Sequence, residues 1–298
     1  MKVVVVGANG FLGSSLVNRL TIGGDEVLAI DASFDSPKIK TNKLVTILQS
    51  SLDDITKVKE ELKNKKYDLL YNFAWRGVNG PEKSDYEIQK ENISLSLKCA
   101  YLAESLGCKK YLCAGTIAER AIESIDIIDE VSPSMVYAVS KMYSRIVLNP
   151  LCKSLGVEFI WMQFSNVYGP TNKTGNLVSY TINQLTNNEP ALFGPANQPY
   201  DFIFVDDLIE AVYRLGHTKT SKKSYFIGSG KPMILFKYLE KIGNILGKKD
   251  LIRIGARPDD KIKYNFSMFN AEQTMEEIGD YTSGSFDKLI KYTIDNYS

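Results

Sequence analysis

Three glycines near the start of the chain, Gly7, Gly10 and Gly13, restrict the fold more than any other feature. They follow Lys2–Val6, a run of β-branched residues that is typical of a buried parallel strand. A leucine then recurs every four residues, at Leu12, Leu16 and Leu20, as on one face of a helix that ends at Gly23-Gly24. A strand, a glycine loop and a helix in this order predict backbone N–H groups that bind a dinucleotide pyrophosphate. A tight turn that binds nothing is the alternative.

Hydrophobic runs continue to alternate with helical patterns through the first two-thirds of the chain. We expect further strands at residues 27–30, 44–48, 69–74, 110–113 and 159–164. Helical patterns occupy residues 54–63, 85–106 and 137–155. This alternation predicts a Rossmann-type α/β fold, a doubly wound parallel sheet with right-handed crossovers.

The alternation breaks after about residue 169, where shorter elements are separated by loops rich in Gly and Pro. We expect residues 1–168 to form the NAD(P)-binding domain, to which later segments return. Residues 169–298 are expected to form mainly a smaller C-terminal substrate-binding lobe. In sheets of this class the ligand crevice lies at the carboxyl ends of the strands.

Charge and cysteine usage narrow the class of protein. The 36 basic and 35 acidic residues nearly cancel, so we expect no nucleic acid and no membrane surface as partner. No segment approaches the roughly 20 apolar residues of a membrane span, and the amino terminus does not resemble a signal peptide. Cys99, Cys108, Cys113 and Cys152 form no CxxC pair, and His217 is expected to be a surface residue after a helix. We therefore expect a reduced cytoplasmic protein without a metal site.

An acid follows the second expected strand. Asp31 stands where a carboxylate can accept hydrogen bonds from the adenosine ribose hydroxyls. The same charge repels a 2′-phosphate. The sequence therefore favours NAD, with NADP as the alternative.

Two Tyr-x-x-x-Lys pairs, Tyr86–Lys90 and Tyr137–Lys141, each place both side chains on one helix face. A nearby ammonium is expected to lower the tyrosine pKa, so that the hydroxyl can exchange a proton while hydride moves to or from nicotinamide. Only the second pair follows a strand that ends near a hydroxyl, Thr116. We assign catalysis to the second pair and a solvated helix face to the first.

Together these features resemble the extended short-chain dehydrogenase/reductase family, in particular its nucleotide-sugar epimerases, dehydratases and reductases. The resemblance covers nearly the whole chain. Its landmarks are the glycine loop; Tyr-Ala-Val-Ser-Lys from Tyr137; Asn-Val-Tyr-Gly-Pro from Asn166; Asp-Phe-Ile-Phe-Val-Asp-Asp from Asp201; Gly-Ser-Gly from Gly228; and Arg257-Pro258.

The resemblance implies roles for the matching residues. The implied catalytic triad is Thr116, Tyr137 and Lys141. The implied cofactor-binding residues are Gly7, Gly10, Phe11, Leu12, Gly13, Asp31, Leu52, Phe73, Ala74, Asn92, Tyr137 and Lys141. The implied substrate-binding residues are Trp75, Arg76, Thr116, Asn166, Asn176 and Arg257. Structural roles stay open for three of them: helix stabilisation for Asn92, turn formation for Asn166 and packing for Trp75.

This sequence departs from the family's pattern at several positions. Ala114-Gly115 replaces a common serine pair, and Tyr200 replaces an arginine that commonly meets the diphosphate. Arg257 or Arg76 would then carry more of that charge.

The residues after Thr116 bear on the reaction. Dehydratases of the family carry Asp-Glu directly there, whereas this chain has Ile117-Ala118, with Glu119 out of register. A 4-keto-6-deoxysugar reductase in deoxysugar biosynthesis or a 4-epimerase remains. We favour the reductase because Ala-Trp-Arg-Gly from Ala74 resembles such enzymes. A non-catalytic NAD(P)-binding sensor or partner protein is the alternative of another class.

Relatives commonly dimerise through two long helices that match residues 85–106 and 137–155. The resemblance therefore implies a homodimer held by a four-helix bundle, with a nucleotide-diphosphate sugar as ligand.

Overall fold

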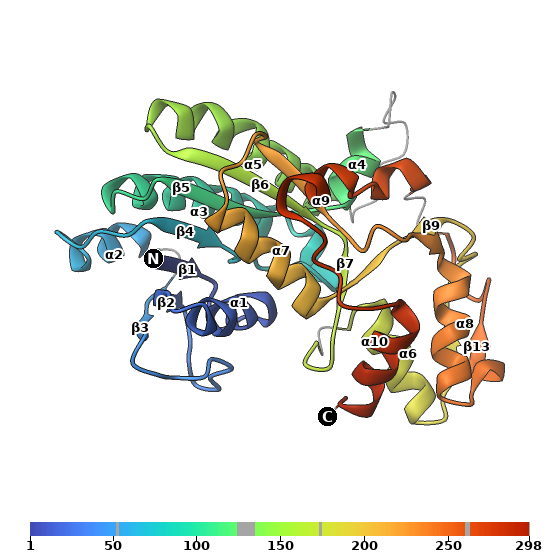
Figure 1. Cartoon of the computed structure of the whole chain (residues 1–298). Coiled ribbons are helices and arrows are strands. Elements are labelled where there is room, and N and C mark those ends of the chain that lie inside the picture. The colour runs from blue at the N-terminus through green and yellow to red at the C-terminus, as the bar shows by residue number, and fades with distance from the viewer. Residues whose placement is uncertain (52–53, 124–134, 173–174, 260–262, 298) are drawn as a thin grey trace. The chain divides into compact units, whose positions relative to one another are not determined.

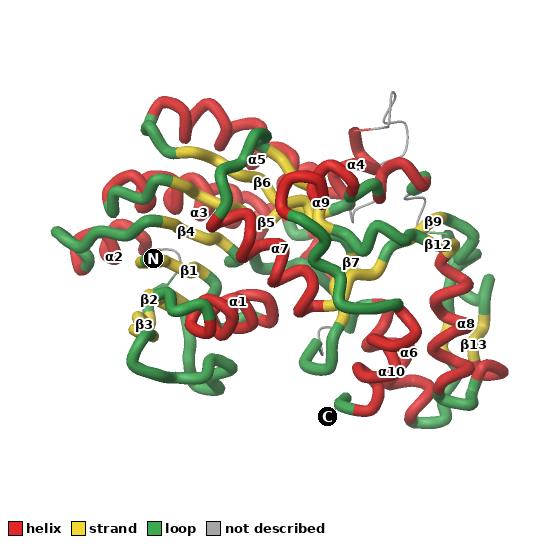
Figure 2. Tube along the Cα trace, viewed as in Figure 1, coloured by secondary structure: helices red, strands yellow, loops and turns green. Residues whose placement is uncertain are grey.

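The computed structural model describes residues 1–51, 54–123, 135–172, 175–259 and 263–297 of the chain (Figures 1 and 2). The residues cluster into two compact units. The first unit falls within Met1–Glu119, Pro133–Gln163 and Ile209–Tyr225. The second falls within Arg120–Ser132, Phe164–Leu208 and Phe226–Ser298.

A seven-stranded parallel sheet forms the centre of the fold, in the order β11-β6-β5-β4-β1-β2-β3. Its strands are β1 (Lys2–Val6), β2 (Glu26–Asp31), β3 (Val45–Gln49), β4 (Leu69–Asn72), β5 (Lys110–Thr116), β6 (Glu158–Phe164) and β11 (Ser224–Ile227). Strand order reverses at β1, which pairs with β2 on one side and β4 on the other. Ligands bind at such a switch point in open α/β sheets. The expected Rossmann-type fold is confirmed. Strand β11 was not predicted from the sequence.

Helices α2 (Ile55–Glu61), α3 (Tyr86–Ser105) and α5 (Met135–Ser154) contribute to one buried cluster with the sheet. Val4 and Val6 of β1 belong to this cluster, whereas Val3 and Val5 are equally buried outside it. This division follows from the alternation of side chains along a strand. It explains why residues 3–6 of β1 are all valine, since both faces of the sheet are covered there.

Helix α1 (Phe11–Ile22) and the later part of α7 (Val205–His217) pack together elsewhere in the first unit. Arg19 Nε donates to Glu210 Oε2 over 2.7 Å, and its guanidinium carbon lies 3.7 Å from the Tyr213 ring centroid. His217 is in the last turn of α7, half-buried, with Nε2 2.9 Å from Asp25 Oδ2. The expectation of a surface histidine after a helix is therefore wrong, because this ring stacks on Tyr213.

The second unit contains shorter elements around an aromatic centre. Its strands are β7 (Asn166–Tyr168), β8 (Ala191–Leu192), β9 (Pro199–Tyr200), β10 (Phe202–Phe204), β12 (Met233–Ile234) and β13 (Ile252–Arg253). Its helices include α6 (Leu177–Thr186), α8 (Leu235–Ile245), α9 (Glu272–Ile278) and α10 (Phe286–Asp295), with 3-10 turns at Lys249–Leu251 and Phe266–Phe269. Phe202 lies edge-on to Tyr168 and to Tyr238, with ring centroids 6.3 and 5.0 Å apart.

The described residues also form the short helix α4 (Ala118–Glu123) and a 3-10 turn at Pro81–Ser84. Among the described helices, none is long and apolar enough to span a membrane.

Candidate active site

The glycine loop joins β1 to α1 at the carboxyl edge of the sheet. Gly7 has a φ of +77°, and a Cβ there would lie 2.5 Å from the backbone nitrogen of Ala74. A Cβ on Gly13 would lie 2.0 Å from the carbonyl oxygen of Gly7. Both positions therefore require glycine for close backbone packing. Gly10 is less crowded, with 3.3 Å to the same oxygen.

Helix α1 starts at Phe11 and has no side-chain cap at Gly10. The first-turn N–H groups of a helix, here including Phe11 and Leu12, lack acceptors within the helix, and the positive end of the helix dipole lies there. An uncapped terminus beside an uncrowded glycine fits an anion such as a pyrophosphate.

Alanine is expected to act differently at Gly13 and at Gly10: on stability at the first and on cofactor binding at the second. We expect Gly13→Ala to lower the free energy of unfolding by about 3 kcal/mol, because backbone must shift to admit the Cβ. Gly10→Ala should change stability by less than about 1 kcal/mol but weaken NAD(H) binding by tenfold or more. Denaturant unfolding and cofactor fluorescence titration measure the two effects. Equal stability losses in both variants would contradict this division of roles.

Asp31 is the last residue of β2. Its Oδ2 accepts a 2.8 Å hydrogen bond from the Asn9 backbone N–H, and its Oδ1 accepts 2.7 Å from Ala32 N–H. A carboxylate has about four acceptor sites, so these two bonds fix its orientation and leave capacity for hydroxyl donors. The geometry suits a ribose diol.

The other residues expected at the cofactor lie in three places. Phe73 and Ala74 follow β4 and adjoin Gly7, as the close approach of their backbones shows. Leu52 lies outside the described residues. Asn92, on α3, uses both ends of its side-chain amide on the backbone of Arg76, with distances of 2.9 and 2.8 Å. It therefore holds the segment after β4 in place, whatever else it contacts.

Thr116, Tyr137 and Lys141 meet in the first unit. Thr116 is the last residue of β5, and its hydroxyl shares a side-chain hydrogen bond with Tyr137. Lys141 is one turn further along α5, only 3% exposed, and its Nζ donates 2.7 Å to the Ala114 carbonyl oxygen. A strand end and a helix thus bring a hydroxyl, a phenol and an ammonium together.

Burial shifts the pKa values of Tyr137 and Lys141 in opposite directions. Burial raises the pKa of Tyr137 and is the largest effect. The hydrogen bond from Thr116 lowers this pKa by a smaller amount, and the Glu119 carboxylate raises it. The net shift is therefore upward, whereas the sequence led us to expect a pKa lowered by Lys141. Burial lowers the pKa of Lys141 to about 8. Tyr137 is therefore a neutral phenol at neutral pH.

Trp75 packs against the pair. Its ring lies edge-on to Tyr137 at 6.2 Å between centroids, and Lys141 Nζ lies 3.6 Å from the Trp75 ring centroid. Its indole N–H donates 2.8 Å to Gln89 Oε1, which fixes the ring. The neighbouring Arg76 is exposed and ion-paired with Glu91.

The competing Tyr86–Lys90 pair lies on solvent. Tyr86 is 75% exposed, and Lys90 is ion-paired with Glu87 of the same helix. Its expected place on a solvated helix face is confirmed.

The other expected substrate residues belong to the second unit. Asn166 accepts a 3.0 Å hydrogen bond from the Tyr200 hydroxyl and donates to the Asp201 carbonyl oxygen. Asn176 caps α6 and donates 2.9 Å to the Val167 carbonyl oxygen. Arg257 lines a hollow of about 270 Å³ together with Tyr200. Both asparagines thus order the local backbone, whereas the arginine lines this hollow.

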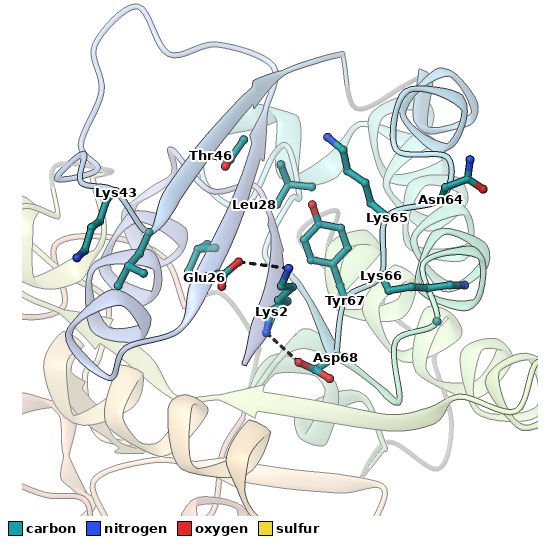
Figure 3. Close-up of a pocket in the computed structure, with 13 residues that line it drawn as sticks. Lys2, Glu26, Leu28, Lys43, Thr46, Asn64, Lys65, Lys66, Tyr67 and Asp68 are labelled. Carbon is teal, nitrogen blue, oxygen red and sulfur yellow. Dashed lines mark hydrogen bonds and ion pairs between the residues drawn. The ribbon is translucent and has the colours of Figure 1, made fainter.

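A larger hollow, of about 900 Å³, lies in the first unit (Figure 3). Lys2 and Glu26, the first residues of β1 and β2, line it with Asp68, which precedes β4. It is therefore at the amino edge of the sheet, opposite the glycine loop. Two of its carboxylates contact Lys2: Glu26 Oε2 lies 3.5 Å from Lys2 Nζ, and Asp68 Oδ2 accepts a hydrogen bond from the Lys2 backbone N–H. This hollow is not the dinucleotide site.

The sequence reading missed Glu119 and Arg145 as members of the site. The carboxylate of Glu119 is fully buried and accepts a 2.7 Å hydrogen bond from the Thr116 backbone N–H. Arg145 Nε lies 3.7 Å from Glu119 Oε2. The sequence did contain a signal for Arg145. Every fourth residue of α5 lies on one face, and this spacing joins Arg145 to Tyr137 and Lys141.

Comparison with known proteins gives consistent results. A model of the NAD dependent epimerase/dehydratase family matches residues 3–228. The dTDP-4-dehydro-6-deoxyglucose reductase of Escherichia coli is 23% identical, with 97% of this chain and 96% of the relative covered. CDP-abequose synthase of Salmonella muenchen is 26% identical, with 86% and 84% covered. UDP-glucose 4-epimerase of Thermotoga maritima, solved with UDP-glucose, has a TM-score of 0.85 at 20% identity over 100% and 98% of the chains.

Proposed function

The chain belongs to the NAD dependent epimerase/dehydratase family, and we propose that it reduces the 4-keto group of a nucleotide-diphosphate 4-keto-6-deoxyhexose. The observation that carries this proposal is the geometry of the triad: the buried Tyr137 lies beside the hydroxyl of Thr116 at the end of β5, with the buried ammonium of Lys141 one helical turn further on. A reductase needs a proton donor at the carbonyl oxygen, and a buried, protonated tyrosine is one. Two relatives named for 4-keto-sugar reduction or deoxysugar synthesis support the same reaction.

The first unit offers the residues that would hold NAD(H). The uncapped start of α1 would bind the pyrophosphate, and Asp31 would accept from the adenosine ribose. Phe73 and Ala74 would line the cofactor beside Gly7. The reduced nicotinamide, when bound, supplies the hydride. NADP remains the alternative, disfavoured by the negative charge of Asp31.

Each residue of the triad would have a separate role in the reduction. Thr116 would donate a hydrogen bond to the sugar carbonyl oxygen and hold it. Tyr137 would transfer its hydroxyl proton to that oxygen as the C4–H bond forms, so the ketone becomes an alcohol. Lys141 would hold the nicotinamide ribose and supply positive charge to the phenolate that is left. In the second unit, Arg257 and its hollow would take the nucleotide diphosphate.

A 4-epimerase is the second candidate. The same triad serves it, and the chain shares its fold with a UDP-glucose 4-epimerase. A 4,6-dehydratase is not proposed, because Ile117-Ala118 provides no acid and no base directly after Thr116.

Turnover of a 4-keto-6-deoxy sugar tests the proposal. Purified protein is mixed with NADH or NADPH and the dTDP- or CDP-linked ketosugar, and absorbance of the reduced nicotinamide is followed. We expect the absorbance to fall, faster with NADH. No fall, together with isomerisation of UDP-glucose, would make the epimerase the better account. No reaction at all would leave a cofactor-binding protein without this chemistry.

We also propose a cytoplasmic homodimer. Helices α3 and α5 lie side by side (Figure 1). Val139, Tyr143 and Ile146 form an exposed apolar stripe on α5, and Tyr101 is exposed on α3. A second copy would cover this face as a four-helix bundle. Sedimentation at micromolar concentration tests the dimer, and a monomer would contradict it. The four buried free cysteines suit the reducing cytoplasm.

A further inference from the structure

A buried carboxylate lies directly behind the strand end that presents Thr116. Glu119 is 0% exposed and belongs to α4. Its Oε1 accepts from the Thr116 backbone N–H at 2.7 Å, and its two oxygens lie 3.1 and 3.0 Å from the Trp161 indole nitrogen. Gln163 Nε2 donates to Oε2 over 3.3 Å. One side chain therefore joins the end of β5 to β6.

The backbone around this carboxylate is shaped to admit it. A Cβ on Gly115 would lie 2.3 Å from the Trp161 indole nitrogen and 2.8 Å from Glu119 Oε1. Any larger residue at 115 would displace the indole or the carboxylate. The glycine before Thr116 is thus required by the contacts of Glu119.

The same carboxylate faces the catalytic helix. Arg145 lies 3.7 Å away as an ion-pair partner, and Lys141 also acts electrostatically on Glu119. Glu119 in turn raises the pKa values of both Tyr137 and Lys141. From β5 and β6, Thr116, Trp161 and Gln163 each donate a hydrogen bond to this carboxylate. From α5, the cations Arg145 and Lys141 and the phenol of Tyr137 interact with it electrostatically. The ionised carboxylate accepts from all of these donors. A protonated carboxyl would instead place its own O–H donor against groups that also donate.

We propose that Glu119 is a positioning residue, whose ionised carboxylate fixes the backbone of Thr116 and stabilises the buried ammonium of Lys141 beside Tyr137. This inference rests on the proposed function, because it assigns Glu119 a part in that proton transfer. It requires the enzyme to lose activity when Glu119 is protonated.

The test compares Glu119→Gln with wild type and with Glu60→Gln, the same change at an exposed position of α2. Burial raises the pKa of Glu119 to about 7. Wild-type kcat should therefore fall as pH drops below about 7. Glu119→Gln should lower kcat by roughly tenfold to a hundredfold at pH 8, as small misplacements of catalytic groups do, and should remove this pH dependence. The Kd for NADH should stay within threefold, and Glu60→Gln should match wild type.

A second variant keeps the proposal testable if Glu119→Gln does not fold. Arg145→Gln removes a positive charge that favours the carboxylate, so the fall in kcat should move to higher pH. A purely structural Glu119 would not shift the profile.

The outcomes separate the two proposals. Kcat of Glu119→Gln within twofold of wild type, or an unshifted profile in Arg145→Gln, overturns the role of Glu119 alone. A wild-type protein that reduces no ketosugar overturns the proposed function instead.

Discussion

Replacing Tyr137 by phenylalanine is expected to reduce kcat by about a hundredfold to ten-thousandfold, the usual contribution of a positioned acid or base. The change removes one oxygen, and with it the hydrogen bond to Thr116. The ring keeps its edge contact with Trp75. Stopped-flow measurement of NADH oxidation at saturating ketosugar gives kcat, and fluorescence titration gives the Kd for NADH, which should change less than threefold.

The matched control is Tyr86→Phe. Tyr86 begins the other Tyr-x-x-x-Lys pair and is 75% exposed, so its hydroxyl should have no part in turnover. Kcat of this variant should equal wild type within twofold. Retained activity in Tyr137→Phe, or a comparable loss in Tyr86→Phe, would show that the wrong pair has been assigned.

Replacing Lys141 by methionine is expected to abolish turnover while stabilising the fold at neutral pH. Its ammonium is 3% exposed, and burial lowers its pKa from 10.5 to about 8. A depressed lysine pKa means that the folded state disfavours the charge that the unfolded chain carries. The cost is full below about pH 8 and disappears as pH rises to about 10.5. It amounts to about 3 kcal/mol, since one pKa unit is worth about 1.4 kcal/mol.

Lost contacts offset part of that gain. The bond from Lys141 Nζ to Ala114 and the contact with Trp75 are each worth about 1 kcal/mol. We therefore expect Lys141→Met to raise the free energy of unfolding by about 1 kcal/mol at pH 7, and to lower it above about pH 10. Denaturant unfolding at both pH values measures this. A variant that is less stable at pH 7 would show that the ammonium is not strained by burial.

Much of the first unit could be predicted because its signals are local. The strand, glycine loop and helix of residues 2–22 follow from β-branched residues, glycine spacing and leucine periodicity. Strand β11 was missed because Ser224–Ile227 is short and lies where the strand–helix alternation has already broken down. Its place at the sheet edge depends on pairing with β6, which is distant in sequence.

The triad could also be predicted from the sequence. Tyr137 and Lys141 share a helix face, but so do Tyr86 and Lys90. The hydroxyl of Thr116 near a strand end favoured the second pair, and the family resemblance implied the triad. The direction of the tyrosine pKa could not be predicted, because it depends on burial and on where the ammonium points. Glu119 was dismissed as out of register, since its importance comes from Trp161 and Gln163 on a strand more than 40 residues away.

Transfer of deuterium tests the central claim most directly. The protein is given NADH carrying deuterium at both C4 positions of the nicotinamide, with a dTDP- or CDP-linked 4-keto-6-deoxyhexose. The sugar product is then examined by mass spectrometry and NMR. Reduction predicts one deuterium at C4 of the sugar for each NADH oxidised, and transfer about a hundredfold to ten-thousandfold slower in Tyr137→Phe. A sugar without deuterium and an unchanged amount of NADH would contradict the assignment as a reductase.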